Sequence, residues 1–522
     1  MFVEAFVGAF GLLLDWQVWL FVIFGAFFGV VIGALPGIGT TLGYALLIPV
    51  TLALPPVVAV SMLLSVAVGG QFGNSLPAIL LGVPGGPSAM MTVLDGHALY
   101  KKGRGDLALG ASYLAALVGQ AISVPLFVLL VIPLAGLAYV FQAPELFAMF
   151  TLGMVAIVSL VSENVIKGLL SVAFGMALAL VGLDPLTSTD RFTFGIRELR
   201  PGLDEAALVV GLLAVGELFR QARQRFQWRE IAESATKARV RMPSLKEMGG
   251  RDIAPALLGG TLIGTLEGAI PGGGATTASL VAYQQAKLWS KHPEEFGKGS
   301  LTGIIANESA QNASNSGELI PTLALGIPAS GSMLVLLAAL TVQGFVPGPF
   351  LITRNPELLY AAIAGLLGGT IILAIVGMRL AGWMLIAARI DRSAVIIASL
   401  ALVVVGVWAL NGSVVDVVVV VAAGIVGYVM YTHGYNPAAA ALAVVLGRGF
   451  EESLRHGLAL SDDSFITMAT RPVTAALLIA SVVLLIIGFW KEHRFRARMK
   501  LLADPPGGIP SESAAVSRQD EP

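Results

Sequence analysis

The chain has 522 residues, of which 56% are hydrophobic and only 12% are charged, and its formal net charge is -1. Soluble globular proteins usually carry about 25% charged residues, so the composition excludes an ordinary water-soluble fold and indicates a membrane protein. The sequence contains no cysteine, which excludes disulfides, thiolate metal sites and cysteine nucleophiles.

Apolar stretches along the chain are long enough to span a bilayer. The first residues, MFVEAFVGAFGLLLDWQ, lack a basic start and a cleavage pattern, so we expect no cleaved signal peptide. Crossing about 30 Å of hydrocarbon takes roughly 20 apolar residues. Residues 17–32, 121–140, 357–378, 393–409, 413–431 and 473–490 reach or approach this length. We therefore predict an all-α polytopic membrane protein with about 10–12 transmembrane helices.

A Pro-Gly-x-Gly break occurs twice. GALPGIGTT at 33–41 recurs as GAIPGGGATT at 268–277. Proline removes a backbone N–H and glycine permits positive φ, so a helix is expected to stop at each break. The residues at and after the breaks are Pro36, Gly37, Gly39, Thr40 and Thr41 in the first copy, and Pro271, Gly272, Gly274, Thr276 and Thr277 in the second.

A second duplicated feature follows each break. GNSLPAILLGVPGGPS at 73–88 recurs as GELIPTLALGIPASGS at 317–332. The apolar segments around Pro84 and Pro328 are about half as long as a span, which predicts a re-entrant helical hairpin in each copy. A third pair, FGMALALVGLDP and AGIVGYVMYTHGYNP, keeps the same order.

These matches divide the chain into two membrane repeats. We predict a first repeat at 1–220, a basic cytoplasmic linker at 221–250 and a second repeat at 251–465. An extra transmembrane helix with a basic cytoplasmic end is expected at 466–500, and a disordered Pro- and Ser-rich tail at 501–522.

The distribution of basic residues predicts that the repeats are inverted. Lys and Arg gather at 101–104, 220–251 and 491–500, which we place in the cytoplasm rather than against nucleic acid. The loop 344–356, which matches 100–105, has only Arg354. One element later the bias reverses, as inverted-topology repeats require.

The breaks and hairpins predict a site for an anion. Free N–H groups at the start of a half-helix, with the helix dipole, suit a carboxylate. Close packing of small residues is the alternative interpretation of any single glycine. Besides the break residues, the expected lining comprises Gly73, Asn74, Ser75, Pro84, Asn312, Ser314, Asn315, Ser316 and Pro328.

Two acidic residues are candidates for coupling transport to an ion. Glu267 precedes the second break, and Glu308 lies in the polar run before the second hairpin. An acid within a membrane is costly, so coupling to Na⁺ or H⁺ is one interpretation and a helix cap or interface position is the other. We expect no other cofactor and no bound structural metal.

An enzyme and a channel are the rival functions. An intramembrane enzyme needs a nucleophile with a base, a metal motif or paired aspartates, and we find neither H-E-x-x-H nor G-x-S-x-G. We therefore predict that the chain is not an enzyme. An anion-selective channel is the alternative, although duplicated hairpins favour a transporter with alternating access.

Over residues 15–490 the sequence resembles the large membrane subunit of tripartite tricarboxylate transporters, the TctA family. The resemblance is most specific in GALPGIG, SLPAILLGVPG, PGGGATTASLVAYQQAKLWSKHPEEFGKG and ESAQNASNSGELIPTLALGIPASGS. It implies secondary-active uptake of an organic di- or tricarboxylate across the bacterial inner membrane. It also implies a small four-helix membrane subunit and a periplasmic binding protein as partners.

The chain departs from the family pattern within the expected lining. The family pattern has Gly-Gly where this chain has Gly73-Asn74, Asn before Thr-Pro-Gly where it has Gly82-Val83-Pro84-Gly85, and Asn-Asn where it has Gln311-Asn312. Transport of some organic carboxylate is compatible with these changes, but citrate does not follow from the resemblance.

Overall fold

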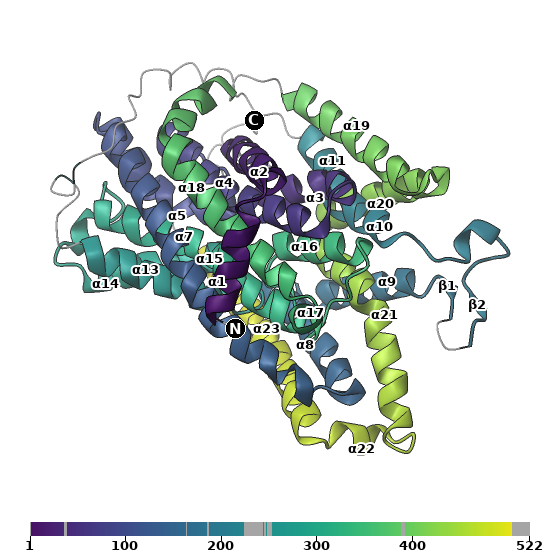
Figure 1. The fold of residues 1–522 in the computed structure, drawn as a ribbon. Helices are drawn as coiled ribbons and strands as arrows, with labels where there is room; N and C mark the ends of the chain where they lie inside the picture. The colour runs from purple at the N-terminus through teal and green to yellow at the C-terminus, as the bar shows by residue number, and fades with distance from the viewer. Residues whose placement is uncertain are drawn as a thin grey trace, which may run out of the picture.

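The computed structural model describes residues 2–35, 39–162, 164–184, 187–223, 244, 247, 253–387 and 392–503 (Figure 1). Most of these residues belong to helices. The predicted linker at 221–250 and tail at 501–522 lie almost wholly outside the described residues.

The first half of the chain forms a series of helices of very different lengths. They are α1 (Phe2–Leu12), α2 (Trp16–Ala34), α3 (Gly39–Leu52), α4 (Pro56–Leu81), α5 (Met90–Thr92), α6 (Ala98–Lys101), α7 (Gly105–Gly136), α8 (Ala143–Val161), α9 (Val165–Ala179), α10 (Glu205–Val210) and α11 (Gly216–Arg223). Short 3-10 or π-helical turns connect some of them, namely η1 (Pro87–Ala89), η2 (Val93–His97), η3 (Leu137–Val140), η4 (Arg197–Leu199) and η5 (Gly211–Val215).

The second half again begins with a pair of helices separated by a break. Its helices are α13 (Ile253–Gly268), α14 (Gly274–Trp289), α15 (Leu301–Leu325), α16 (Gly331–Val342), α17 (Leu351–Arg354), α18 (Pro356–Ala387), α19 (Arg392–Asn411), α20 (Val414–Thr432), α21 (Pro437–Ala459), α22 (Phe465–Ala469) and α23 (Pro472–Ala503), with the short turn η8 (Pro293–Glu295).

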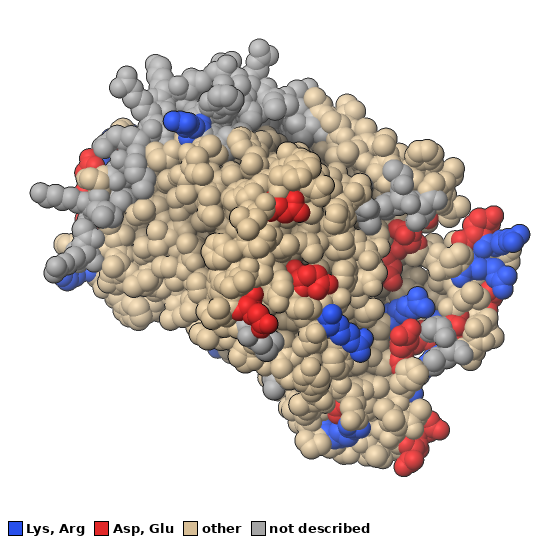
Figure 2. Space-filling model, in the orientation of Figure 1, with Lys and Arg blue, Asp and Glu red and all other residues tan. Residues whose placement is uncertain are grey.

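Six helices of the described chain are long and apolar enough to cross a membrane. They are Trp16–Ala34, Pro56–Leu81, Gly105–Val140, Pro356–Arg379, Val414–Thr432 and Pro472–Arg494, and seven shorter apolar helices accompany them. Much of the face in Figure 2 carries no charge, and the charged side chains gather mainly at its lower right. The chain is therefore a multi-pass all-α membrane protein with six candidate spans among its described residues, and the predicted total of 10–12 stays a prediction.

Helices α4 and α15 are almost wholly buried, and each packs along one partner helix. Helix α2 packs along α4, and α13 packs along α15, while α7 lies against α15 and α18 against α4. Both pairs meet through glycines, because a Cβ on Gly29 would come within 2.4 Å of Val66 O and one on Gly264 within 2.2 Å of Ala310 O. Such small residues let the backbones of membrane helices approach closely.

The segments around the two hairpin tips differ in length from the prediction. The helices before the tips, α4 with 26 residues and α15 with 25 residues, are long enough to span a bilayer. The segments after the tips are short, and α16 has 12 residues. Pro77 and Pro321 lie inside α4 and α15 without ending them, and each helix stops five residues later, at Gly82 and Gly326.

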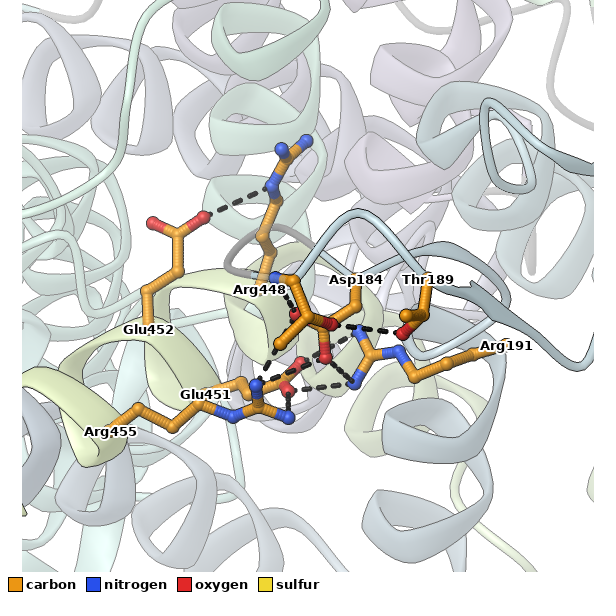
Figure 3. Close-up of polar contacts among 8 residues, drawn as sticks. Asp184, Thr189, Arg191, Arg448, Glu451, Glu452 and Arg455 are labelled. Carbon is orange, nitrogen blue, oxygen red and sulfur yellow. Dashed lines mark hydrogen bonds and ion pairs between the residues drawn. The ribbon is translucent and has the colours of Figure 1, made fainter.

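One small antiparallel pair of strands, β1 (Gly182–Leu183) and β2 (Asp190–Arg191), lies at the right edge of Figure 1. An ion network joins it to α21 (Figure 3). Arg191 donates to both oxygens of Glu451, at 2.7 and 3.1 Å, and Arg455 lies 3.0 Å from Asp184. The hydrogen bond to Glu451 raises the pKa of the Arg191 guanidinium despite partial burial. The network therefore fixes the loop on the end of α21.

Candidate functional site

The two breaks start new helices, as the sequence predicts. After the first break, α3 begins at Gly39, whose φ is +68°. After the second, α14 begins at Gly274, where φ is +58°, and Gly272 has φ of +80°. Residues with a side chain rarely adopt such backbone angles, so these positions favour glycine. Pro36 and Gly37 lie outside the described residues.

Each hairpin tip brings an extended segment back toward the breaks. Helices α4 and α15 end at Gly82 and Gly326 in the same left-handed conformation, with φ of 70° and 72°. In the second tip the Ser330 hydroxyl caps α16 by accepting a hydrogen bond from the N–H of Met333. A helix N-terminus therefore starts directly at the tip.

A cavity of about 470 Å³ lies where breaks and tips meet. It is lined by Gly39, Thr40, Thr41, Ala67, Gln71, Asn74, Gly86, Pro87, Ser88, Gly272, Gly273, Gly274, Ala275, Thr276, Thr277, Asn315, Glu318, Ala329, Ser330, Gly331, Ser332 and Met333. Both breaks, both tips and the middles of α4 and α15 contribute. Thr276 and Thr277 are exposed, so the cavity is open on the side of α14.

Hydrogen bonds across the cavity tie elements of one half to elements of the other. The hydroxyls of Thr41, after the first break, and Ser332, at the second tip, are 3.0 Å apart. On the other side, the Ser279 hydroxyl of α14 donates to Ser88 O at the first tip, at 2.8 Å. The contacts are therefore reciprocal, since each break region touches the opposite tip.

The lining is polar and nearly free of charge. Helices α3, α14 and α16 all begin at the cavity, and their first N–H groups and dipoles favour a negative group there. The lining residues, all of them described, include no Lys, Arg or His, and Glu318 is the one acidic member. The cavity can therefore hold an anion through hydroxyls, amides and main-chain N–H groups.

Glu318 already accepts hydrogen bonds from two of the donors at the cavity. Its Oε1 accepts a hydrogen bond from the N–H of Ala275, at 3.2 Å, and its Oε2 accepts one from the Ser330 hydroxyl, at 2.6 Å. The side chain is 4% exposed. One buried carboxylate thus bridges the second break and the second tip.

The structure brings together some of the predicted lining residues and separates others. Those that line the cavity are Gly39, Thr40, Thr41, Asn74, Gly272, Gly274, Thr276, Thr277 and Asn315. Those that do not line it are Gly73, Ser75, Pro84, Asn312, Ser314, Ser316 and Pro328. Helical periodicity explains the separation of the residues on α4 and α15, because each helix turns only one stripe of side chains toward the cavity.

Several predicted polar residues serve contacts elsewhere. Asn312 donates to Glu308 O at 2.9 Å, and Ser314 donates to Gln311 O at 2.8 Å. Ser316 accepts a hydrogen bond from the Gln120 side chain of α7, at 2.9 Å. These side chains therefore join α15 to itself and to α7.

Glu308 lies in a separate buried polar cluster. Its carboxylate is 0% exposed and accepts hydrogen bonds from the Ser75 hydroxyl, at 2.8 and 2.7 Å to its two oxygens, and from the Thr92 hydroxyl. Gln311 donates to it at 3.3 Å, and no salt bridge to Glu308 is found among the described residues. The carboxylate is thus held by neutral groups alone.

The other predicted acid, Glu267, has a different environment. It lies half-buried on α13 and lines neither the cavity nor the cluster around Glu308. The two candidates for ion coupling are therefore in unlike surroundings, and the buried Glu308 is the more unusual.

Sequence reasoning missed the acid inside the cavity. Glu318 was not among the predicted residues, nor were Ser88, Ser330 and Ser332. The sequence did contain a signal for Glu318, because it aligns with Asn74, a predicted lining residue, when 317–332 is aligned with 73–88.

A larger cavity of about 870 Å³ lies near the ion network. Its lining contains Glu198, Asp204, Glu205, Asp416 and Glu452 but only one basic residue, Arg448. A predominantly acidic wall repels a carboxylate, so this cavity is the weaker candidate for an anion site.

Comparison with known proteins identifies the family. The model of the tripartite tricarboxylate transporter TctA family matches residues 19–442. This chain belongs to the TctA family. The predicted resemblance is thereby confirmed, and so is the expectation that the chain is not an enzyme, since TctA proteins are transporters.

Two relatives from Agrobacterium vitis are similar to this TctA chain. An "uncharacterized 52.8 kDa protein in TAR-I ttuC' 3'region" is 35% identical over 477 residues, which cover 91% of this chain and 94% of the relative. An "uncharacterized protein in TAR-II ttuC' 3'region" is 36% identical over 241 residues, or 46% of this chain and 100% of the relative. No solved structure matches.

Proposed function

We propose that this TctA chain is the permease subunit of a binding-protein-dependent transporter that takes up an organic di- or tricarboxylate across the bacterial inner membrane. Uptake proceeds by alternating access and is driven by a Na⁺ or H⁺ gradient. The observation that carries the proposal is the polar cavity at which α3, α14 and α16 all begin.

The chemistry of the cavity supports a carboxylate substrate. Thr40 and Thr41 lie in the first turn of α3, where hydroxyl and main-chain donors point at the same space. Asn74 Oδ1 is buried and lacks a hydrogen-bond partner. Asn74 Nδ2 donates one hydrogen bond, to Gln71 Oε1 at 3.3 Å, so the second N–H of the amide is available to a carboxylate in the cavity.

The structure supports two halves built on the same plan. Gly29 lets α2 approach α4, and Gly264 lets α13 approach α15. The two glycines occupy matching positions, because they are 235 residues apart, as are Gly39 and Gly274 at the breaks. The caps at Gly82 and Gly326 share their conformation. With the opposite charge bias of equivalent loops, these matches favour inverted-topology repeats with re-entrant elements after the tips.

Inverted halves provide a route to alternating access. Each break region contacts the opposite tip through Thr41–Ser332 and Ser279–Ser88. If one of these two contacts broke while the other formed, the cavity would open to one side of the membrane. The reverse exchange would open it to the other side. Motion of the tips with α4 and α15 against the remaining helices would accomplish this exchange.

The buried carboxylate of Glu308 supports coupling to an ion. A carboxylate that is surrounded only by neutral groups costs several kcal/mol unless it binds a proton or a cation. Its contacts with the hydroxyls of Ser75 and Thr92 resemble the oxygen-rich surroundings that a hard monovalent cation prefers. Glu267 has no comparable set of partners among the described residues.

Membership in the TctA family supports the proposed partners. The family forms part of a tripartite system, so we propose a small four-helix membrane subunit and a periplasmic binding protein that delivers the substrate. The lipid bilayer is the remaining contact, and no role for nucleic acid is proposed.

Uptake measurements test this function. Purified chain with its two partner subunits in proteoliposomes should accumulate at least one labelled di- or tricarboxylate, with sodium and proton gradients varied separately. Thr41→Ala should weaken substrate binding roughly 10- to 100-fold, because a hydrogen bond to a charged group contributes about 1.5–3 kcal/mol. Thr51→Ala, at the far end of α3 and outside the cavity, is the matched control.

The outcome also separates a transporter from an anion-selective channel. Saturable uptake that follows an imposed ion gradient supports the transporter, whereas ohmic single-channel currents support the channel. Identical kinetics for Thr41→Ala and the unmodified chain would contradict the proposed site.

A further inference from the structure

We infer that Glu318 is the residue that binds the coupling proton, so that a carboxylate entering the cavity is accompanied by uptake of one proton at Glu318. The inference rests on the proposed function. It narrows that function by assigning the coupled ion, a proton, to Glu318 in the cavity and not to Glu308, the buried acid outside the cavity.

The first observation is an asymmetry between the two halves of the cavity. Gly73-Asn74 aligns with Gly317-Glu318, so Asn74 and Glu318 occupy matching positions on α4 and α15, and both line the cavity. The first half therefore presents a neutral amide where the second presents an acid. A site that only needed to bind a dianion would gain from an amide at both positions, because a carboxylate repels the substrate.

The second observation is that Glu318 occupies the donors that its own half provides. It accepts hydrogen bonds from the N–H of Ala275, in the first turn of α14, and from the hydroxyl of Ser330, which caps α16. The Ser330 oxygen itself accepts from the N–H of Met333, so its proton is directed to Glu318. Both oxygens of Glu318 thus act as acceptors, as in an ionised carboxylate.

The third observation is that none of the described residues that line the cavity is a Lys, Arg or His that could pair with this acid. Of the described residues that line the cavity, Glu318 is the only titratable one. Tyr44 of α3, whose buried hydroxyl has no hydrogen-bond partner, lies within electrostatic range of it. On α13 the nearest acid is Glu267, which is half-exposed and outside the lining, and on α15 Glu308 lies ten residues away, or roughly 15 Å along the helix.

These observations lead to a proton-linked binding step. When a substrate carboxylate enters, two carboxylates share one cavity, and like charges this close favour protonation of one of them. A hydronium ion from the open side transfers its proton to a Glu318 oxygen and leaves water. The protonated Glu318 then donates a hydrogen bond to the substrate, and the proton returns to water on the other side when substrate and acid separate.

Calorimetry of succinate binding tests the inference directly. Succinate is a dianion at about pH 7.5, and titrating it into the purified full chain in buffers of different ionisation enthalpy gives the number of protons taken up per substrate. We expect about one proton for the unmodified chain. Its succinate affinity should then fall about tenfold for each unit of rising pH in the range where Glu318 is ionised before binding.

Substitutions at the three candidate acids locate the proton. Glu318→Gln keeps the shape and an acceptor oxygen, and it should bind succinate with about zero proton uptake and little dependence on pH. Glu267→Gln, on a half-exposed position outside the cavity, should keep the uptake of one proton. If Glu308→Gln rather than Glu318→Gln removes the uptake, the inference is wrong and the proton belongs to the other cluster.

The outcomes separate this inference from the proposed function. Succinate binding without proton uptake by the unmodified chain overturns the inference alone and needs no variant. Absence of binding for succinate and citrate alike overturns the proposed site as well. Should Glu318→Gln fail to fold, Glu318→Asp keeps an acid on a shorter side chain, so the pH range in which the proton is taken up should shift. An unchanged pH range in that folded variant would count against Glu318.

Discussion

The close approach of α13 to α15 provides the most direct test of the architecture around the cavity. Helix α15 carries Asn315 and Glu318, and α13 holds it in position through glycines that face its backbone. In Gly264→Ala the added Cβ would lie 2.2 Å from Ala310 O, whereas ordinary contact begins at 3.4 Å. The two helices would therefore have to separate by about 1 Å locally.

The same substitution at Gly259 is a matched control on the same helix. A Cβ at Gly259 has no atom within 4 Å, so Gly259→Ala gains only the helix propensity of alanine, about 0.5–1 kcal/mol. Overpacking typically costs about 1–3 kcal/mol, and backbone oxygens yield less than flexible side chains. We therefore expect Gly264→Ala to lower the free energy of unfolding and Gly259→Ala to raise it slightly, so that the two variants differ by roughly 2–4 kcal/mol.

Thermal unfolding of the purified proteins in one detergent measures this difference. Gly264→Ala should melt several degrees below the unmodified chain, and Gly259→Ala should melt at or slightly above it. Equal melting temperatures for the two variants, or a more stable Gly264→Ala, would refute the close contact of α13 with α15.

Two further predictions concern topology and the loop that carries β1 and β2. The chain has no cysteine, so a single introduced cysteine can be labelled with a membrane-impermeant reagent. Lys102→Cys should react only from the cytoplasm, and Val346→Cys, in the matching loop of the second half, only from outside. Labelling of both from the same side would contradict inverted repeats. Asp184→Ala removes the acceptor of the Thr187 N–H and a partner of Arg455, which should cost about 1–3 kcal/mol locally. Proteolysis between β1 and α10 should therefore be faster, and an unchanged cleavage rate would show that the network does not hold the loop.

Part of the site could be predicted because its determinants are local. A proline with two glycines ends a helix through the backbone of a few residues, so both breaks could be placed from the sequence, and α3 and α14 begin where expected. The duplication also indicated that breaks and tips belong to one unit. Their side chains do line one cavity.

The length of the tip segments was harder to predict. The segments around Pro84 and Pro328 were predicted to be about half as long as a span, yet α4 and α15 before the tips have 26 and 25 residues and continue through Pro77 and Pro321. A proline within a membrane helix is tolerated when neighbouring helices support the freed backbone, and α4 and α15 are buried among such neighbours. That support is a property of the assembled bundle.

The sequence by itself determined that the chain is a multi-pass membrane protein with duplicated breaks, because composition and backbone chemistry act within short segments. Only the tertiary structure decided which polar side chains share one space. Helix α15 carries Asn312, Ser314 and Glu318 within two turns of one another. The orientation of α15 about its axis places Glu318 at the cavity and the other two against other partners. The physical reason is that packing against α7 and α13 fixes this rotation, and no local pattern encodes it.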